Sequence, residues 1–236
     1  MRTIITLVYI AVFLIISLPV SGIQWLIAPR DKQKRDKMIL CYVQWMFRCV
    51  EKLSGSTVTV QGLENIPKDR PVLYIGNHQS FFDIVVTYSR LPGLTGFISK
   101  QNVFKVPLLG WLMKRLHCLG IDRSSLRSGL NTVLESIDEI KHGVSIFIYP
   151  EGTRSKDGKV HEFHAGSFKI ATKAKCPVVP VAVNGTRDIL EYHFPNIKKS
   201  HVTLTFGEPI ETRDMSREEI KELPNRVRDQ IIDMMG

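Results

Sequence analysis

A histidine and an aspartate lie five residues apart in the stretch 77–83, which follows a predicted strand and opens a predicted helix. The apolar run 72–76 predicts the buried strand, and apolar residues at helical spacing over 81–91 predict the helix. Histidine takes up and returns protons near neutral pH, and a carboxylate bonded to one ring nitrogen holds the other free as a base. His78 and Asp83 are therefore candidate catalytic residues, but one such pair does not establish catalysis by itself.

A second group of polar residues follows the strongest strand signal of the chain, the apolar run 144–149. Gly152 allows the backbone to approach a ligand, Thr153 supplies a hydroxyl, and Arg154 offers a planar fork that matches phosphate. Considered alone, the same segment is also compatible with a turn that carries a surface ion pair.

Basic residues recur at the ends of the predicted strands, namely Lys100, Lys105, Arg123 and Arg154. Each of them alone is typical of a solvated surface charge. Gathered at the sheet edge that carries His78, they would form a pocket for a phosphate group.

Motifs of several other chemistries are incomplete or absent. Gly152 and Gly158 resemble a nucleotide-binding loop, but five residues separate them and Val160 stands where that loop needs serine or threonine. The chain has no G-x-S-x-G serine motif and no G-x-G-x-x-G dinucleotide motif. The nucleophile is therefore not expected to be a protein serine, which suits a histidine that acts directly on a substrate hydroxyl.

A metal site and a disulfide framework are both disfavoured. The sequence H-E-F-H at 161–164 lacks the i, i+4 histidine pair of zinc enzymes and has no obvious third ligand. The four cysteines form no C-x-x-C pair and lie mostly in apolar runs; they are Cys41, Cys49, Cys118 and Cys176. This predicts buried, reduced thiols in a protein that faces a cytosolic compartment.

The composition is that of a globular protein with an anionic partner. The 236 residues are 44% hydrophobic and 23% charged, which allows one sizeable domain with an appendage. A formal charge of +9 is compatible with nucleic acid, an anionic lipid surface or a phosphorylated substrate. Nucleic acid is disfavoured, because the charge is not concentrated on one helix and no nucleic-acid-binding motif is present.

The N-terminal segment decides in favour of a membrane. No charged residue occurs from Thr3 to Ala28, and as a helix the apolar run 3–20 would be about 27 Å long, slightly less than the hydrocarbon core of a bilayer. Pro19 and Gly22 are expected to bend or end this helix. A spanning anchor and a segment that dips into one leaflet both stay open, whereas a cleaved signal peptide is disfavoured by its single basic residue and poor cleavage site.

The segment 30–37 places five basic residues against two acidic ones directly after the apolar run. This order favours anionic headgroups and a catalytic domain on the cytoplasmic side of the cell membrane. A helix predicted over 38–53 either lies against the membrane, docks the first helix or belongs to the core. We expect a membrane-anchoring helical segment over 1–53 and a catalytic domain over 54–236.

Strands and helices alternate through the body of the chain, which predicts an α/β fold with a mixed, largely parallel sheet flanked by helices. The polar motifs follow strands, where open α/β sheets place their sites. The predicted strands cover 57–60, 72–76, 94–99, 118–121, 144–149, 178–183 and 202–206, and the predicted helices cover 81–91, 108–116, 125–141, 166–173 and 216–235.

Four ordered stretches together resemble the glycerolipid acyltransferase family. They are Asn77-His78 with Asp83, Gly120-Ile121-Asp122-Arg123, Pro150-Glu151-Gly152-Thr153-Arg154 and Val179-Pro180-Val181. The segments 99–111 and 163–166 also look like those of the family. One departure is His164, where relatives often carry lysine. The order of the four stretches makes the resemblance highly specific.

This resemblance implies a glycerol-3-phosphate acyltransferase-like fold and transfer of an acyl group from acyl-CoA or acyl-acyl carrier protein to lysophosphatidic acid. His78, oriented by Asp83, would be the general base, without an acyl-enzyme and without a metal or redox cofactor. Backbone amides near the junction of His78 with the helix would steady the oxyanion. Binding of the acceptor and its phosphate is expected from the remaining site residues, Lys105, Arg123, Glu151, Gly152, Thr153 and Arg154.

Two other functions stay open from the sequence. The first is an acyltransferase that acts on another lysolipid, although Arg123 and the intact segment 150–154 favour a phosphate. The second is a membrane lipid-binding protein without catalytic activity, which would have no need for an oriented base. Membrane lipids are expected partners in every case, and nucleic acid in none.

Overall fold

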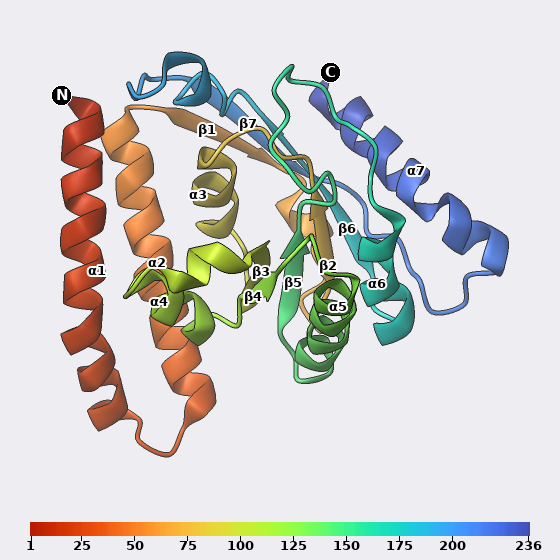
Figure 1. The fold of residues 1–236 in the computed structure, drawn as a ribbon, viewed down its shortest axis with the longest axis horizontal. Coiled ribbons are helices and arrows are strands. Elements are labelled where there is room, and N and C mark those ends of the chain that lie inside the picture. The colour runs from red at the N-terminus through yellow and green to blue at the C-terminus, as the bar shows by residue number, and fades with distance from the viewer.

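The computed structural model describes all residues, 1–236, and contains one seven-stranded sheet (Figure 1). The strands are β1 (Thr57–Gln61), β2 (Leu73–Gly76), β3 (Thr95–Lys100), β4 (Leu119–Ile121), β5 (Ser145–Ile148), β6 (Val178–Asn184) and β7 (His201–Phe206). They lie in the order β1-β7-β6-β2-β5-β3-β4, and every neighbouring pair is parallel except β6 and β7. The predicted α/β fold with a mixed, largely parallel sheet is confirmed.

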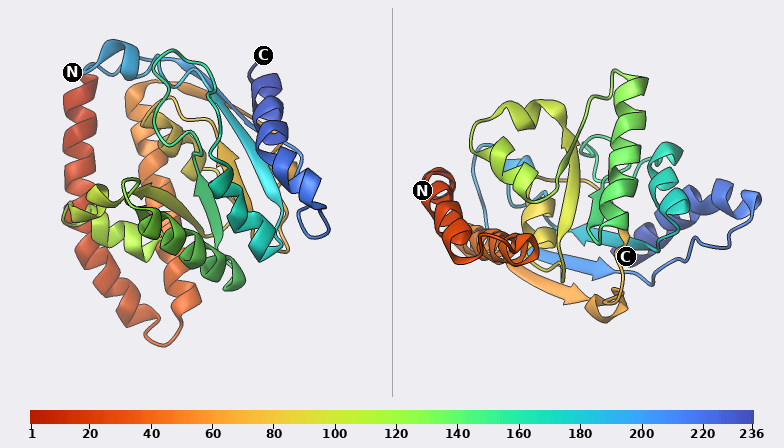
Figure 2. Two further views of the ribbon diagram at one scale, coloured as in Figure 1. Left: turned by 45° about the vertical axis from the view of Figure 1, so that its right-hand side comes forward. Right: turned by 90° about the horizontal axis from the view of Figure 1, so that it is seen from below.

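Helices cover both faces of the sheet, as the view from below in Figure 2 shows. They are α1 (Arg2–Ile27), α2 (Lys32–Ser54), α3 (Phe82–Tyr88), α4 (Leu109–Arg115), α5 (Leu126–Lys141), α6 (Lys169–Ala174) and α7 (Arg217–Met235). Helices α2, α3 and α4 pack on the face that holds Tyr74 and Phe147, and α5, α6 and α7 pack on the face that holds Leu73 and Ile146. Strands β2 and β5 are apolar on both faces, which is the pattern of buried parallel strands.

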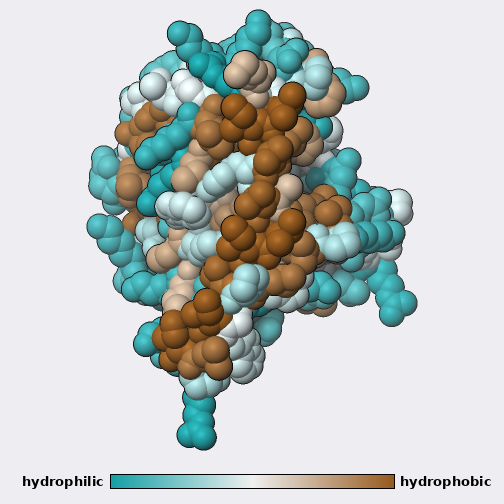
Figure 3. All heavy atoms as spheres, turned by 90° about the vertical axis from the view of Figure 1, so that its left-hand side faces the viewer, coloured by the Kyte–Doolittle hydropathy of each residue, from teal (hydrophilic) through white to brown (hydrophobic).

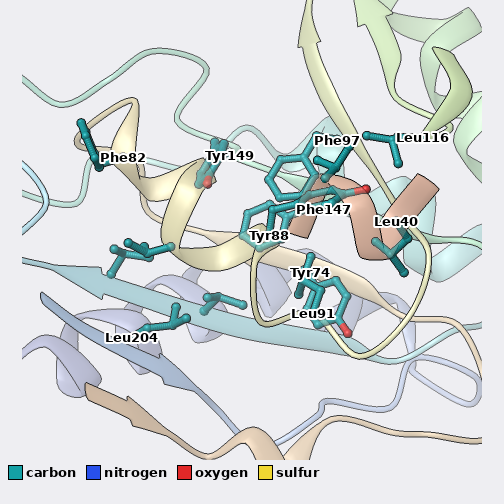
Figure 4. Close-up of a cluster of buried hydrophobic side chains, with 14 of the residues drawn as sticks. Leu40, Tyr74, Phe82, Tyr88, Leu91, Phe97, Leu116, Phe147, Tyr149 and Leu204 are labelled. Atoms are coloured by element: carbon teal, nitrogen blue, oxygen red, sulfur yellow. The ribbon is translucent and has the colours of Figure 1, made fainter. Parts of the chain in front are cut away.

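An aromatic cluster fills the core on the α2–α3 side of the sheet (Figure 4). The ring of Phe147 stacks on Phe97 with centroids 4.5 Å apart and on Tyr74 at 5.8 Å. Tyr149 continues the series, since its ring centroid lies 4.9 Å from that of Phe147. Close-packed rings of this kind give rigid support to the residues that follow β5.

The first two helices form an antiparallel hairpin that runs along one side of the body (Figure 1). Helix α1 continues through Pro19 and Gly22 to Ile27, so neither residue ends it. The residues beyond Pro19 pack on α2 with Ser21 and Gln24 buried, and these tertiary contacts offset the helix-breaking effect of proline. Helix α2 begins at Lys32, before the predicted start at 38, because the carboxylate of Asp31 caps it by accepting from the Lys34 N–H at 2.9 Å.

Helix α1 exposes most of its apolar side chains, whereas Phe13 and four polar side chains are buried. It is the one helix long and apolar enough to cross a membrane. An 18-residue stretch of it has a mean hydropathy of 2.6, and 17% of that stretch is buried. The buried face carries Thr6, Ser17, Ser21 and Gln24 toward α2, and the apolar side chains form a continuous band on the surface (Figure 3). A contiguous apolar patch of this size marks an interaction site.

Helix α2 holds the C-terminal end of α3. The Gln44 amide donates to the carbonyl groups of Tyr88 and Leu91 at 3.1 and 2.8 Å, and Arg48 donates to that of Ser89 at 3.1 Å. These donors satisfy carbonyl groups that a helix end leaves unpaired. The hairpin is therefore part of the structure that positions α3.

The prediction that all four cysteines are buried is wrong for one of them. Cys41 is exposed on α2, Cys49 and Cys118 are partly buried, and Cys176 is buried. Cys41 lies on the side of α2 that borders an open apolar groove with α1, so its apolar neighbours in sequence do not cover it. All four thiols are free.

Candidate active site

His78 and Asp83 are hydrogen-bonded at the point where β2 ends and α3 begins. Nδ1 of His78 lies 2.8 Å from Oδ2 of Asp83. The Asp83 side chain is fully buried, whereas the His78 side chain keeps 17% of its surface exposed. Nε2 of His78 has no partner within the chain, so this nitrogen is available to a substrate.

The carboxylate of Asp83 is held by three further donors. Its Oδ2 accepts from the N–H groups of Gln79 and Ser80 at 2.6 and 2.8 Å, and its Oδ1 accepts from the Thr186 hydroxyl at 2.5 Å. Hydrogen bonds of this number compensate a buried carboxylate for the water that it loses. Asp83 is thus fixed in one position, and it fixes the ring of His78.

Tyr149, at the end of β5, supports the other side of the His78 ring. The two rings stack with centroids 4.1 Å apart and planes 15° from parallel. Burial, reinforced by the charge of Asp83, raises the pKa of Tyr149 well above its usual value, so its phenol stays neutral. Gly76 leaves room for this stack, because a methyl group there would lie 2.9 Å from the Phe147 ring and 3.2 Å from that of Tyr149.

Glu151 lies beneath His78 and binds backbone rather than facing open space. Its Oε1 accepts from the N–H of His78 at 2.7 Å, and its Oε2 accepts from the N–H of His161 at 3.1 Å. Burial raises the pKa of Glu151, and these two N–H groups oppose part of that rise. Glu151, which the sequence predicts to bind the acceptor, thus holds the loop that carries His78. The Ser155 N–H also holds this loop by donating to the His78 carbonyl at 2.7 Å.

The N–H groups at the start of α3 are not free for an oxyanion. Those of Gln79 and Ser80 bind Asp83, that of Phe81 binds Glu191, and that of Phe82 binds the Ser80 hydroxyl. Side chains within the chain use all four groups, which argues against these amides as donors to an oxyanion, and that expectation stays a prediction.

Gly152 brings two basic side chains together. Its φ of +75° lies in the left-handed region that favours glycine. A methyl group at Gly152 would lie 3.4 Å from Nε2 of His164 and 3.6 Å from Nη1 of Arg123. Partial desolvation lowers the pKa of Arg123, but the guanidinium stays charged at neutral pH and forms no ion pair within the chain.

Arg154 is engaged by a residue that the sequence did not single out. Its Nη1 lies 2.9 Å from Oε1 of Glu191, and its guanidinium carbon lies 3.9 Å from the centroid of the Phe81 ring. Glu191 and Thr186 both come from the connection after β6, far in sequence from the side chains that they contact, Arg154 and Asp83. No local pattern marks either residue, so only the fold reveals them.

The other predicted residues are more open. Thr153 and Lys105 are exposed and have no hydrogen-bond partner within the chain. The pKa of Asp122 is lowered mainly by hydrogen bonds from Ser124, with a smaller effect from Lys105, which places Lys105 near the segment that carries Arg123. Among the histidines of 161–164, Nε2 of His161 pairs with Asp157 at 3.0 Å, and no group of His, Cys, Asp and Glu is arranged to hold a metal ion.

Known proteins resemble this chain in sequence and in structure. The family model described as Acyltransferase matches residues 57–184, more than half of the chain. The chloroplastic 1-acyl-sn-glycerol-3-phosphate acyltransferase BAT2 of Brassica napus is 42% identical over 132 residues, which are 56% of this chain and 38% of that protein. The 1-acyl-sn-glycerol-3-phosphate acyltransferase of Saccharomyces cerevisiae is 28% identical over 81% of this chain and 66% of its own length.

A solved structure matches nearly the whole chain. The crystal structure of the 1-acyl-sn-glycerophosphate acyltransferase PlsC from Thermotoga maritima superposes with a TM-score of 0.79 and 30% identity, over 99% of this chain and 98% of that one. By contrast, the matched region spans less than two thirds of the length of the plant and yeast relatives. Sequence, fold and site together place this chain in the acyltransferase family, alongside the 1-acyl-sn-glycerol-3-phosphate acyltransferases that it resembles.

Proposed function

We propose that this protein transfers an acyl group to the sn-2 hydroxyl of 1-acyl-glycerol-3-phosphate, which gives phosphatidic acid for phospholipid biosynthesis. The observation that carries the proposal is the 2.8 Å contact between Nδ1 of His78 and Oδ2 of Asp83, which leaves Nε2 of His78 available. The printed names of the relatives, 1-acyl-sn-glycerol-3-phosphate acyltransferases, support this choice of acceptor.

His78 acts as the general base in this proposal. Its Nε2 takes the proton of the sn-2 hydroxyl while the hydroxyl oxygen attacks the carbonyl carbon of a thioester. The tetrahedral oxyanion then collapses, the bond between carbon and sulfur breaks, and the leaving thiolate recovers the proton from His78. Asp83 keeps the proton on Nδ1 and stabilises the charged ring, so that the base contributes about 10²–10⁴-fold to the rate.

The acceptor phosphate binds beside Gly152. Arg123 is a cation without an internal partner, Arg154 keeps part of its fork free, and Lys105 is exposed near Asp122. Guanidinium groups bind phosphate through paired hydrogen bonds, which fix orientation as well as supply charge. Thr153 adds an exposed hydroxyl on the same loop. Holding the phosphate in this way presents the hydroxyl to His78 in attack geometry.

The acyl donor is a thioester, either acyl-CoA or acyl-acyl carrier protein. The thioester is itself reactive toward an oxygen nucleophile, and His78 supplies the proton transfer that the step needs. The proposed reaction therefore requires no metal ion or redox cofactor and forms no acyl-enzyme.

The hairpin of α1 and α2 attaches the protein to one leaflet of the cell membrane, with the catalytic domain (54–236) on the cytoplasmic side. Helix α1 is fastened to the body near both ends, because the Thr3 hydroxyl accepts from the Ile197 N–H at 2.9 Å and Arg115 donates to Gln24 at 3.4 Å. A helix fastened in this way lies along the body, and its exposed apolar band meets the acyl chains of lipid. Basic residues of 30–37 then face anionic headgroups.

The test is an acyl-transfer assay with the purified full chain. Lysophosphatidic acid, lysophosphatidylcholine and lysophosphatidylethanolamine are offered with acyl-CoA and with acyl-acyl carrier protein, and release of free thiol is followed. We expect transfer to lysophosphatidic acid and its loss by at least about 100-fold in His78→Ala. His201→Ala, at an exposed histidine on β7 that hydrogen-bonds only Thr59, is the matched control and retains activity.

Two results would contradict the proposal. Preference for a lysolipid without a phosphomonoester would move the function to another acceptor. Substantial activity in a folded His78→Ala variant, judged by an unchanged unfolding temperature, would rule out the general-base mechanism.

A further inference from the structure

Glu191 joins two loops of the site although it belongs to neither. It begins a short 3-10 turn (Glu191–His193) between β6 and β7, outside the region 57–184 that the family model matches. Its Oε1 accepts from Nη1 of Arg154 at 2.9 Å and from the N–H of Phe81 at 3.0 Å. One carboxylate oxygen thus connects the loop after β5 to the start of α3.

Arg154 is held from two directions by this arrangement. Glu191 fixes one edge of its guanidinium, and the Phe81 ring supports its face at 3.9 Å. Only one of the five guanidinium N–H groups is used by the chain, and the Arg154 side chain is 39% exposed. The remaining N–H groups are therefore oriented and accessible at the same time.

The surroundings of the Glu191 carboxylate are not those of an ion pair that serves stability alone. Its side chain is 18% exposed, and its second oxygen, Oε2, is buried without any hydrogen-bond partner. Leaving a charged oxygen unpaired in this way opposes folding. The position of this carboxylate, between Arg154 and the helix of Asp83, favours a role in the site.

We propose that Glu191 is a positioning residue that orients Arg154 toward the phosphate of the acceptor. This inference rests on the proposed function. Through Phe81, which precedes α3, Glu191 also links Arg154 to the helix that carries Asp83 and hence to His78. The phosphate anchor and the base are then held at a fixed separation, which suits an acceptor whose phosphate and hydroxyl are joined by a short glycerol backbone.

The first test compares two substitutions of Glu191 in the full chain, assayed in mixed micelles. Glu191→Ala removes both hydrogen bonds, and we expect the KM for lysophosphatidic acid to rise about ten-fold while the KM for the acyl donor stays within about two-fold. Glu191→Gln keeps an oxygen that can accept from both donors, so its KM for the acceptor stays within about three-fold of the wild type. Glu64→Ala, at an exposed glutamate without an ion pair, is the matched control and changes neither KM.

The second test separates positioning from a structural role with a double-mutant cycle. If Glu191 acts through Arg154, adding Glu191→Ala to Arg154→Ala leaves the acceptor KM unchanged. A further rise in the double variant, together with a lower unfolding temperature, would show that Glu191 only supports the fold.

Other outcomes overturn specific statements. A lower acceptor KM in Glu191→Ala would show that Glu191 competes with the phosphate for Arg154, and an unchanged acceptor KM would show that it does not position Arg154. Wild-type protein that acylates no lysophosphatidic acid would overturn the proposed function, and this inference with it. Wild-type activity is measured first, so the two failures are distinguishable.

Discussion

The orientation of one imidazole ring depends on several separate contacts. The ring of His78 is hydrogen-bonded to Asp83 at 2.8 Å and stacks on the ring of Tyr149 with centroids 4.1 Å apart. The backbone N–H of His78 donates to the Glu151 carboxylate at 2.7 Å. Each contact removes one freedom: the tautomer, the ring plane or the path of the loop. A proton acceptor fixed in this way loses little entropy when it reacts, which is the basis of preorganised catalysis.

Asp83→Asn tests the orienting contact at the scale of the residue. Oδ2 of Asp83 binds His78 as well as the Gln79 and Ser80 N–H groups, so an asparagine that keeps its oxygen there turns its NH2 group toward Thr186. The asparagine is neutral, so it loses the negative charge that stabilises the protonated ring of His78. We expect kcat to fall about 10²–10⁴-fold with little change in the KM for the acceptor. Steady-state kinetics and the unfolding temperature measure this.

A matched change at a second partner of the same carboxylate calibrates the result. Thr186→Val removes one donor to Oδ1 of Asp83, at 2.5 Å, but leaves the bond to His78. We expect a much smaller loss of kcat than in Asp83→Asn. Equal losses in the two variants would show that burial of the carboxylate matters, rather than its bond to the histidine.

The residues of the site divide according to how much of their role a local sequence reveals. His78 and Asp83 are five residues apart, so the strand-to-helix boundary alone predicts their proximity. Thr186 bonds to Asp83 across 103 positions and Glu191 to Phe81 across 110, and contacts of that separation leave no periodic signal. Glu151 lies in a predicted motif, but its contact with the His78 backbone depends on the register of β2 beside β5.

The elements themselves were largely predictable. Apolar runs and helical spacing give all seven strands and the helices of the body, because burial on both faces makes parallel strands apolar throughout. The strand order was not predictable, since nothing local indicates that β7 inserts between β1 and β6. The cap of α3 by Gln44 and Arg48 of α2 was missed for the same reason. The division into segments 1–53 and 54–236 stays a prediction.

A histidine between two carboxylates connects the hairpin to the body. Nδ1 of His117 lies 2.8 Å from Oε2 of Glu139 on α5, and its Nε2 lies 3.4 Å from Oδ2 of Asp36 on α2. The hydrogen bond that His117 donates to the Glu139 carboxylate is the main cause of the raised pKa of His117. Burial opposes this rise, and Asp36 adds to it. Asp36 also acts on Arg115, where its charge opposes the lowering of the pKa by burial.

His117→Ala tests this contact through the pH dependence of stability. A histidine whose folded pKa is raised contributes stability that is fully present below the unfolded value and is lost as pH rises through the folded pKa. We expect the variant to be less stable than the wild type by on the order of 1 kcal/mol at pH 6, and the gap to narrow as the pH increases above 6.5. Unfolding of both proteins across this range measures the gap.

The control for this prediction is another histidine that pairs with an acidic residue. His142 is 71% exposed near the end of α5 and lies 3.5 Å from Asp138. His142→Ala is expected to change stability little at any pH, since solvent screens exposed pairs. If the difference in stability between the wild type and His117→Ala widened as the pH rises, the pKa of His117 would not be raised in the folded protein.

At the scale of the whole molecule, the site and the apolar surface belong to one connected structure. Helix α1 packs on α2, with Phe13 and Tyr42 stacked at 4.4 Å, and α2 in turn caps the helix that carries Asp83. In the proposed function the acceptor is a membrane lipid, and it would reach such a site without leaving the bilayer fully. The arrangement accounts for the exposed apolar band along α1 (Figure 3).

Polar substitutions on the exposed face of α1 therefore separate membrane attachment from chemistry. Leu7, Ile15 and Leu26 are 60%, 62% and 82% exposed, and changing all three to serine removes apolar area that would enter the bilayer. Each such side chain contributes about 1.5–3 kcal/mol when buried, so binding to vesicles with anionic lipid should fall by more than about ten-fold. Activity in detergent micelles should stay within about two-fold, because none of the three contacts the site.

Leu126→Ser, on α5 and 96% exposed, is the matched control and should leave vesicle binding unchanged. Equal vesicle binding by the triple variant and the wild type, measured by co-sedimentation, would show that α1 is not the membrane contact.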